Sequence, residues 1–130
     1  MVTVCIGFSL LFSLLGTCKL QAQERATSEL GDELWTVIEV QLDQQKSDTN
    51  FYFIVQLVHD QCGNDFDCLY ETFRVIRWQL EINFNLPAAI YLSYEMVEIA
   101  KKEEDLEAEG HAYLNLRRFY GAMKNEELSA

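Results

Sequence analysis

The sequence is poor in positive charge. Lysine and arginine number 10 against 21 aspartates and glutamates, which gives a formal net charge of −11. Nucleic-acid binding depends on clustered lysine and arginine at the phosphates, so this balance argues against it. The acidity indicates a solvated acidic surface, and it also suits a basic partner or a cation. Proline is nearly absent: Pro87 is the only one, at a place where a first helical turn tolerates it.

The usual marks of an enzyme are also missing. There is no glycine-rich phosphate loop and no serine in a nucleophile elbow, and His59 and His111 lie far apart in the chain. The acidic run from Glu103 to Glu109 has the pattern of a solvated helix end, whereas acid–base catalysis needs a pocket that separates two carboxyl pKa values. We therefore expect no enzyme, no cofactor and no resident metal within these residues.

Only the amino terminus carries a long apolar run. Residues 1–22 have the length and small-residue ending of a secretory signal peptide cleaved after Ala22, although no lysine or arginine precedes the apolar core. A retained anchor or buried helix is the alternative, and residues 15–18, which end at Cys18, loosely resemble a bacterial lipid-attachment sequence. The prediction is an exported chain, periplasmic or extracellular, with lipid anchoring as the minor alternative and no membrane span after the signal.

Cysteine is scarce once the signal is removed. Cys5 and Cys18 leave with it, and Cys62 and Cys68 remain. A pair in an exported chain favours a disulfide, which would close a short loop and stabilise the fold by about 2–3 kcal/mol. Free thiols are a second interpretation. A metal site that adds His59 is a third, although structural zinc sites prefer tighter cysteine spacing.

Apolar residues recur at helical spacing almost throughout the mature region. The pattern predicts helices over residues 26–45 and 51–62, and a third from residue 66 that ends around residues 83–87. A fourth follows from about residue 89 and a fifth from about residue 108. Gly63 is placed to stop a helix, and Asp65 to start the next. After Lys124 and Asn125 we expect a sixth helix to begin at residue 126.

Two stretches of the chain have similar residues at matching positions, 40 residues apart. The matched pairs are Phe73 with Tyr113, Ile76 with Leu116, Arg77 with Arg117, Leu80 with Tyr120, Asn85 with Asn125, and Ala89 with Ser129. A fixed period of this size is typical of helical repeat arrays, in which each hairpin buries its apolar face against the next. Such arrays bind partners far more often than they catalyse reactions.

Residues 66–130 resemble the tetratricopeptide repeat, and specifically its long-period variety in bacterial sensor and regulator proteins. The fit rests on the aromatic and leucine positions of residues 73–80 and 113–120; residues 26–62 resemble a degenerate first hairpin. Arg77 and Arg117 depart from the family, which has a small residue there, and so does Met96. The resemblance implies an all-α fold of antiparallel hairpins stacked as a short α-solenoid. Residues 66–130 are expected to hold the repeats, with the last unit truncated.

Arg77 and Arg117 are the candidate binding residues. At equivalent positions of successive helices they could present a basic pair to a carboxylate in the groove of the array, or they could pair with a neighbouring glutamate such as Glu81 or Glu95. The resemblance implies a segment that binds a protein or peptide, or associates with itself, at the exported sensor terminus of a larger bacterial signalling protein. The alternative is a stand-alone secreted or lipid-anchored helical structural protein.

Overall fold

The computed structural model describes residues 29–45 and 50–129, which are helical and contain no strand. A helix over residues 29–44 (helix 29–44) comes first. It is followed by α3 (Tyr52–Cys62), α4 (Phe66–Ile82), α5 (Leu86–Glu103) and α6 (Leu106–Ser129). The expected all-α class is confirmed. The predicted signal peptide over residues 1–22 lies outside the described residues, together with Cys5 and Cys18.

Short capping motifs fix most of the helix ends. Gly63 ends α3 with a φ of 62°, and its N–H donates to the His59 carbonyl at 2.8 Å. Asp65 begins α4, because its carboxylate accepts the amide N–H groups of Asp67 and Cys68. Asn85 does the same for α5 through the amide of Ala88, at 3.2 Å. The sequence predicts the ends at Gly63 and Asp65, whereas α5 begins at Leu86, ahead of the predicted start near residue 89. Each of these ends has a side chain or backbone conformation that satisfies orphaned helix-end groups.

The last helix differs from the expectation. We predicted a break at Lys124 and Asn125, but α6 continues through them to Ser129. The helix begins at Leu106, slightly before the predicted start near residue 108, because the Asp105 carboxylate accepts the N–H of Ala108 at 3.0 Å. The expected sixth helix therefore does not exist as a separate element.

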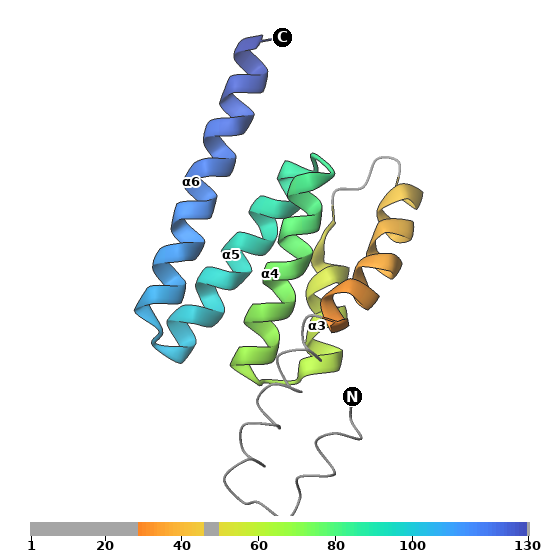
Figure 1. The fold of residues 1–130 in the computed structure, drawn as a ribbon, viewed down its shortest axis with the longest axis vertical. Coiled ribbons are helices and arrows are strands. Elements are labelled where there is room, and N and C mark those ends of the chain that lie inside the picture. Colours follow the sequence, from red (N-terminus) through yellow and green to blue (C-terminus); the bar gives the residue numbers. More distant parts are fainter. Residues whose placement is uncertain (1–28, 46–49, 130) are drawn as a thin grey trace, which may run out of the picture.

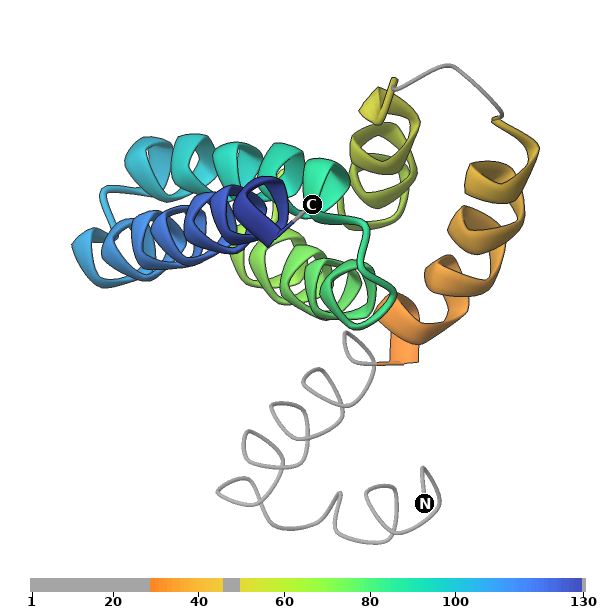
Figure 2. The ribbon, with the colours of Figure 1, turned by 90° about the horizontal axis from the view of Figure 1, so that it is seen from above.

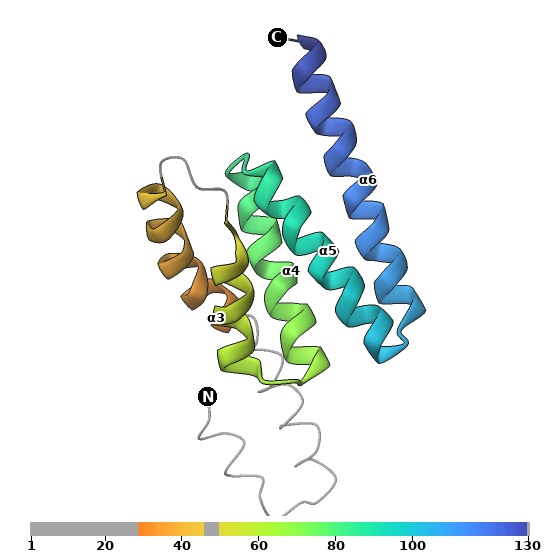
Figure 3. The same ribbon diagram turned by 180° about the vertical axis from the view of Figure 1, so that it is seen from behind.

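The helices lie in two rows. Figure 2 shows α3 and α5 in one row and α4 and α6 in the other, with helix 29–44 at the far end from α6. Successive helices run antiparallel and pack side by side, as seen from both faces in Figure 1 and Figure 3. Neighbouring helices within a row also touch, since Phe51 before α3 contacts Tyr91 of α5 with ring centroids 5.9 Å apart. This arrangement is compatible with a helical repeat.

One apolar core runs between the two rows. Its largest fully buried side chains include Ile38, Ile54, Phe73, Ile76, Leu80, Leu92, Met96 and Phe119. They come from all five helices, at the three- and four-residue steps that the sequence pattern predicts. None of the helices within the described ranges is long and apolar enough to cross a bilayer.

Candidate functional site

Cys62 and Cys68 form a disulfide, with their Cα atoms 5.5 Å apart. The bond joins the end of α3 to the first turn of α4 across the Gly63–Asp65 turn. Cys62 also lies 3.7 Å from the hydroxyl of the buried Thr72. The sulfur atoms are thus part of the packing of this hairpin.

The Cys62–Cys68 disulfide is incompatible with the other two interpretations of these cysteines, free thiols and a metal site. Sulfur atoms bonded to each other are not free thiols, and they cannot act as thiolate ligands to a metal. His59, the third residue of the metal interpretation, packs edge-on against Phe73 with ring centroids 6.2 Å apart. The three residues are half-buried, and Cys62 packs against the hydrophobic core.

Arg77 is buried between α4 and α6. Only 8% of the residue is exposed, and Nε and Nη1 have no hydrogen-bond partner among the described residues. Its guanidinium lies 5.9 Å from the ring centroid of Phe119 on α6. Burial lowers the pKa of Arg77, and the nearby carboxylate of Glu81 partly opposes that shift.

Glu81 forms ion pairs with an arginine of α4 and with an arginine of α6. One of its oxygens lies 3.9 Å from Arg77 Nη1, and Arg118 on α6 forms an ion pair with the same group. Arg118 Nη2 also donates to the Asn115 side chain at 3.0 Å. The Arg118 pair ties α4 to α6 through charge-assisted hydrogen bonds, which are stronger than neutral ones, while the Arg77 contact lies within α4.

A second contact between α4 and α6 lies several turns away. The Tyr70 hydroxyl donates to the carbonyl of Ala108 at 2.9 Å, and burial raises the pKa of Tyr70. The row formed by α4 and α6 is therefore held by side-chain polar contacts at two separate levels.

Arg77 and Arg117 do not meet in one groove. Arg117 is exposed, whereas Arg77 lies under α6. Arg118, one residue further on, is the one that reaches α4. Of the two interpretations for Arg77, the pairing with Glu81 is the one seen, and the expected basic pair is not assembled.

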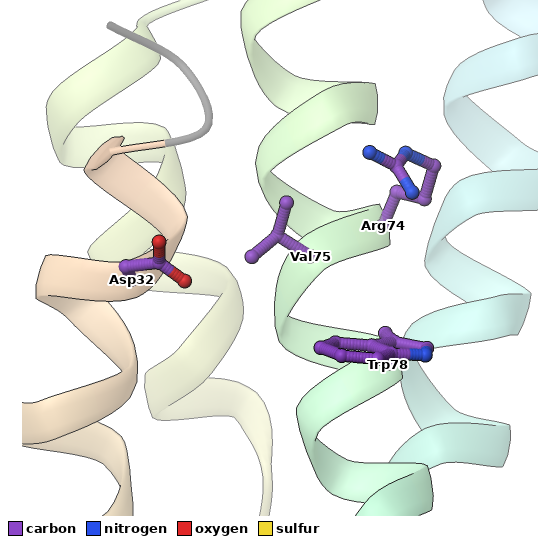
Figure 4. A pocket seen from close by; sticks show the side chains of 4 residues that line it. All are labelled: Asp32, Arg74, Val75 and Trp78. Carbon is purple, nitrogen blue, oxygen red and sulfur yellow. The ribbon is translucent and has the colours of Figure 1, made fainter. Parts of the chain in front are cut away.

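A groove opens between helix 29–44 and α4. It has a volume of about 320 Å³ and is lined by Asp32, Arg74, Val75 and Trp78. Figure 4 shows Asp32 pointing from helix 29–44 toward α4, where Arg74 and Val75 are adjacent and Trp78 lies about one turn further along. We call this set the α4 groove.

The depth of the groove follows from the way its two helices approach. Gly31 is buried against α4, and a Cβ atom there would lie 2.7 Å from Val75 Cβ. The helices therefore touch at backbone distance beside Gly31.

The groove is lined by the indole of Trp78 and by the carboxylate of Asp32. Trp78 is 53% exposed, which is unusual for the largest apolar side chain. Arg74 is engaged by Glu71 of its own helix. Asp32 has no ion pair with any residue in the described ranges. The groove thus offers an indole and a carboxylate to a ligand, while its one cation is already neutralised.

Neither Asp32 nor Trp78 was singled out from the sequence. Trp78 stands on the polar side of the apolar stripe of α4, a position where a tryptophan is out of pattern, and that signal could have been used. Asp32 carries no such signal, because only the packing of helix 29–44 on α4 brings it to the groove.

Comparison of the chain with protein-family profiles, curated proteins and solved structures finds no match.

Proposed function

We propose that this chain is a protein- or peptide-binding helical segment, in which the α4 groove receives the partner. The observation that carries the proposal is that the exposed indole of Trp78 and the carboxylate of Asp32 line one open groove between two helices. The proposal is of binding and not of catalysis within these residues. A tetratricopeptide-like array, with hairpins stacked in two rows, is the architecture that we propose with it.

The repeat interpretation is supported by matching burial in two helices. Ile76 of α4 and Leu116 of α6 are one of the residue pairs matched at a separation of 40 positions. They are 0% and 5% exposed. Each lies on the face that its helix turns toward the core that it shares with α5. This matched pair thus packs alike at a spacing of 40 positions, as stacked repeats require, whereas Phe73 and Leu80 are buried and their counterparts Tyr113 and Tyr120 are exposed.

The charges around the groove indicate a basic segment as the partner. Residues 29–45 contain five acids (Glu29, Asp32, Glu33, Glu39 and Asp43) and no lysine or arginine. A lysine or arginine side chain can lay its stem along Val75 and place its cation over the ring of Trp78, within reach of Asp32. Cation–π and ion-pair contacts of this kind contribute about 0.5–2 kcal/mol each.

Peptide titration tests this assignment directly. With Trp35 replaced by phenylalanine, the emission of Trp78 can be followed while an octapeptide of alternating lysine and alanine is added. A glutamate–alanine octapeptide serves as the negative probe. We expect the basic peptide to bind in a salt-sensitive way and Asp32→Asn to weaken it about tenfold, which corresponds to 1.4 kcal/mol.

Glu33→Gln is the matched control, because it removes the same charge from the neighbouring residue, outside the groove lining. It should change the affinity less than twofold. Equal binding of both peptides, or an Asp32→Asn variant that binds like the parent, would contradict the proposed site.

The wider setting that we propose is the exported sensor region of a larger bacterial signalling protein. The Cys62–Cys68 disulfide supports export, because such bonds persist in oxidising compartments. A stand-alone secreted or lipid-anchored structural protein is the alternative. The reading frame after residue 130 distinguishes them: a continuous frame into a transmembrane and output domain supports the first, and a stop codon supports the second.

A further inference from the structure

The outward side of α6 carries apolar and basic residues in alternation. Leu106, Tyr113 and Tyr120 recur every seven residues and are 80%, 46% and 49% exposed. Arg117 and Lys124 stand between and beyond them and are also exposed. Residues at this spacing share one side of a helix. We call these five residues the α6 stripe.

The equivalent positions of α4 are buried. Phe73 and Leu80 are 0% exposed and Arg77 is 8% exposed, while their counterparts Tyr113, Tyr120 and Arg117 are exposed. In α4 these positions are covered by helices on both sides. The same positions of α6 have α5 on one side only within the described structure. The α6 stripe thus has the composition of a packing face without a second helix upon it.

The tyrosines of the stripe are already held in place by α5. The Tyr120 hydroxyl lies 3.0 Å from that of Tyr94, and the Lys101 ammonium lies 5.9 Å from the ring centroid of Tyr113. Their rings lose little conformational freedom on binding, which is what makes tyrosine an effective contact residue. The surface is therefore preorganised for a partner.

Helix 29–44, at the opposite end of the molecule, exposes apolar and acidic side chains. Val37 and Val40 of helix 29–44 are 51% and 56% exposed. Glu29, Glu33 and Asp43 are exposed beside them. Figure 1 and Figure 2 place this helix and α6 at the two ends of the stack. We call these five residues the acidic end.

We infer that the chain associates with itself head to tail, with the acidic end of one copy docked on the α6 stripe of the next. Valines meet tyrosines and leucine, and glutamates and aspartate meet Arg117 and Lys124. Residues 110–125 contain Arg117, Arg118 and Lys124 and no acid, while residues 29–45 contain acids and no cation. Complementary charge of this kind sets orientation and opposes acidic-to-acidic pairing.

The two surfaces lie at opposite ends, so the contact is heterologous and propagates into short chains of copies instead of closing as a two-fold dimer. The inference concerns surfaces outside the α4 groove. Either one can therefore fail without the other.

Sedimentation of the purified full chain over a range of concentrations tests the inference. We expect the mean mass to rise with concentration beyond a dimer, and to fall when the salt concentration is raised, because the charges at the rim are screened. Arg117→Glu and Glu33→Lys should each weaken the association about tenfold or more. The double variant, which reverses both charges, should restore it in part. Asp32→Asn is the control and should leave the association unchanged.

A mixing experiment identifies the geometry. Tyr120→Asp disables one end and Val40→Asp disables the other, and each variant alone should be monomeric, with an unchanged far-UV circular dichroism spectrum. Mixed in equal amounts they should form a one-to-one dimer and nothing larger, because one intact surface of each kind remains. A parent chain that is monomeric at every concentration would overturn the inference, as would self-association of the Val40→Asp variant.

Discussion

Replacing Gly31 by alanine tests the closest approach between two helices in this fold. Gly31 lies inside helix 29–44, where alanine is favoured over glycine by about 1 kcal/mol. The new Cβ atom, however, would lie 2.7 Å from Val75 Cβ and from Val75 Cγ1. No ordinary carbon contact is that short, and a Cβ atom cannot rotate away.

The two effects have opposite signs, and their sizes predict the outcome. Forcing an extra methyl group into a packed contact costs about 1–3 kcal/mol, which equals or exceeds the gain in helix propensity. Gly31→Ala should therefore lower the free energy of unfolding by up to about 2 kcal/mol. Gly110 and Gly121 of α6 provide the control, since a Cβ atom at either would meet nothing within 4 Å. Alanine there should raise stability by about 1 kcal/mol.

Urea unfolding followed by far-UV circular dichroism measures these differences for the same chemical change at three glycines. A second readout is local: in a Trp78→Phe background, Trp35 reports on helix 29–44, because it packs against the core. We expect its emission to shift to the red in the Gly31→Ala variant, as the helix moves away from α4. If Gly31→Ala proved as stabilising as Gly110→Ala, the close packing of the two helices would be refuted.

Three further substitutions test other parts of the fold. Cys62→Ser with Cys68→Ser should cost about 2–3 kcal/mol in urea unfolding, and intact mass without reductant should show the parent two hydrogens lighter than its reduced form. Glu81→Gln should cost about 1–3 kcal/mol, because it leaves the arginine buried between α4 and α6 without its carboxylate, while the exposed pair broken by Glu71→Gln should cost under about 1 kcal/mol; equal losses would contradict the burial argument. Burial raises the pKa of Glu95, so its protonated form is favoured in the fold, and stability is lost as the pH rises through that pKa; Glu95→Gln should therefore stabilise the protein at pH 7 and show no advantage near pH 4.

Local chemistry made most helix ends predictable. Gly63, Asp65 and Asn85 act within three or four residues of themselves, so their roles can be read from the sequence. Asn125 shows the limit of that approach. Asn125 matches Asn85 in the 40-residue comparison, yet it lies inside α6. The neighbouring residues account for the difference: Pro87 comes two residues after Asn85, and Phe84 before it adopts a left-handed φ of 59°, whereas two glutamates come after Asn125 and continue a helix readily.

Long-range packing accounts for what the sequence did not predict. Arg77 and Arg117 are the same residue at equivalent places, and only the presence of α6 beside one of them separates buried from exposed. Asp32 and Trp78 are 46 positions apart and line the same groove because Gly31 packs closely on Val75. Spacing along a helix identifies which face a residue occupies, but it does not identify which helix covers that face.

Negative charge is concentrated at one end of the stack, in helix 29–44. All arginines between residues 29 and 129 (Arg74, Arg77, Arg117 and Arg118) lie on α4 and α6, while helix 29–44 carries acids alone. One acidic helix would then serve both proposed contacts, a basic partner on its groove side and the α6 stripe of another copy on its outer side. Asp32→Asn should weaken only the first and Glu33→Lys mainly the second. Gly31→Ala should weaken both, because it displaces the helix that they share.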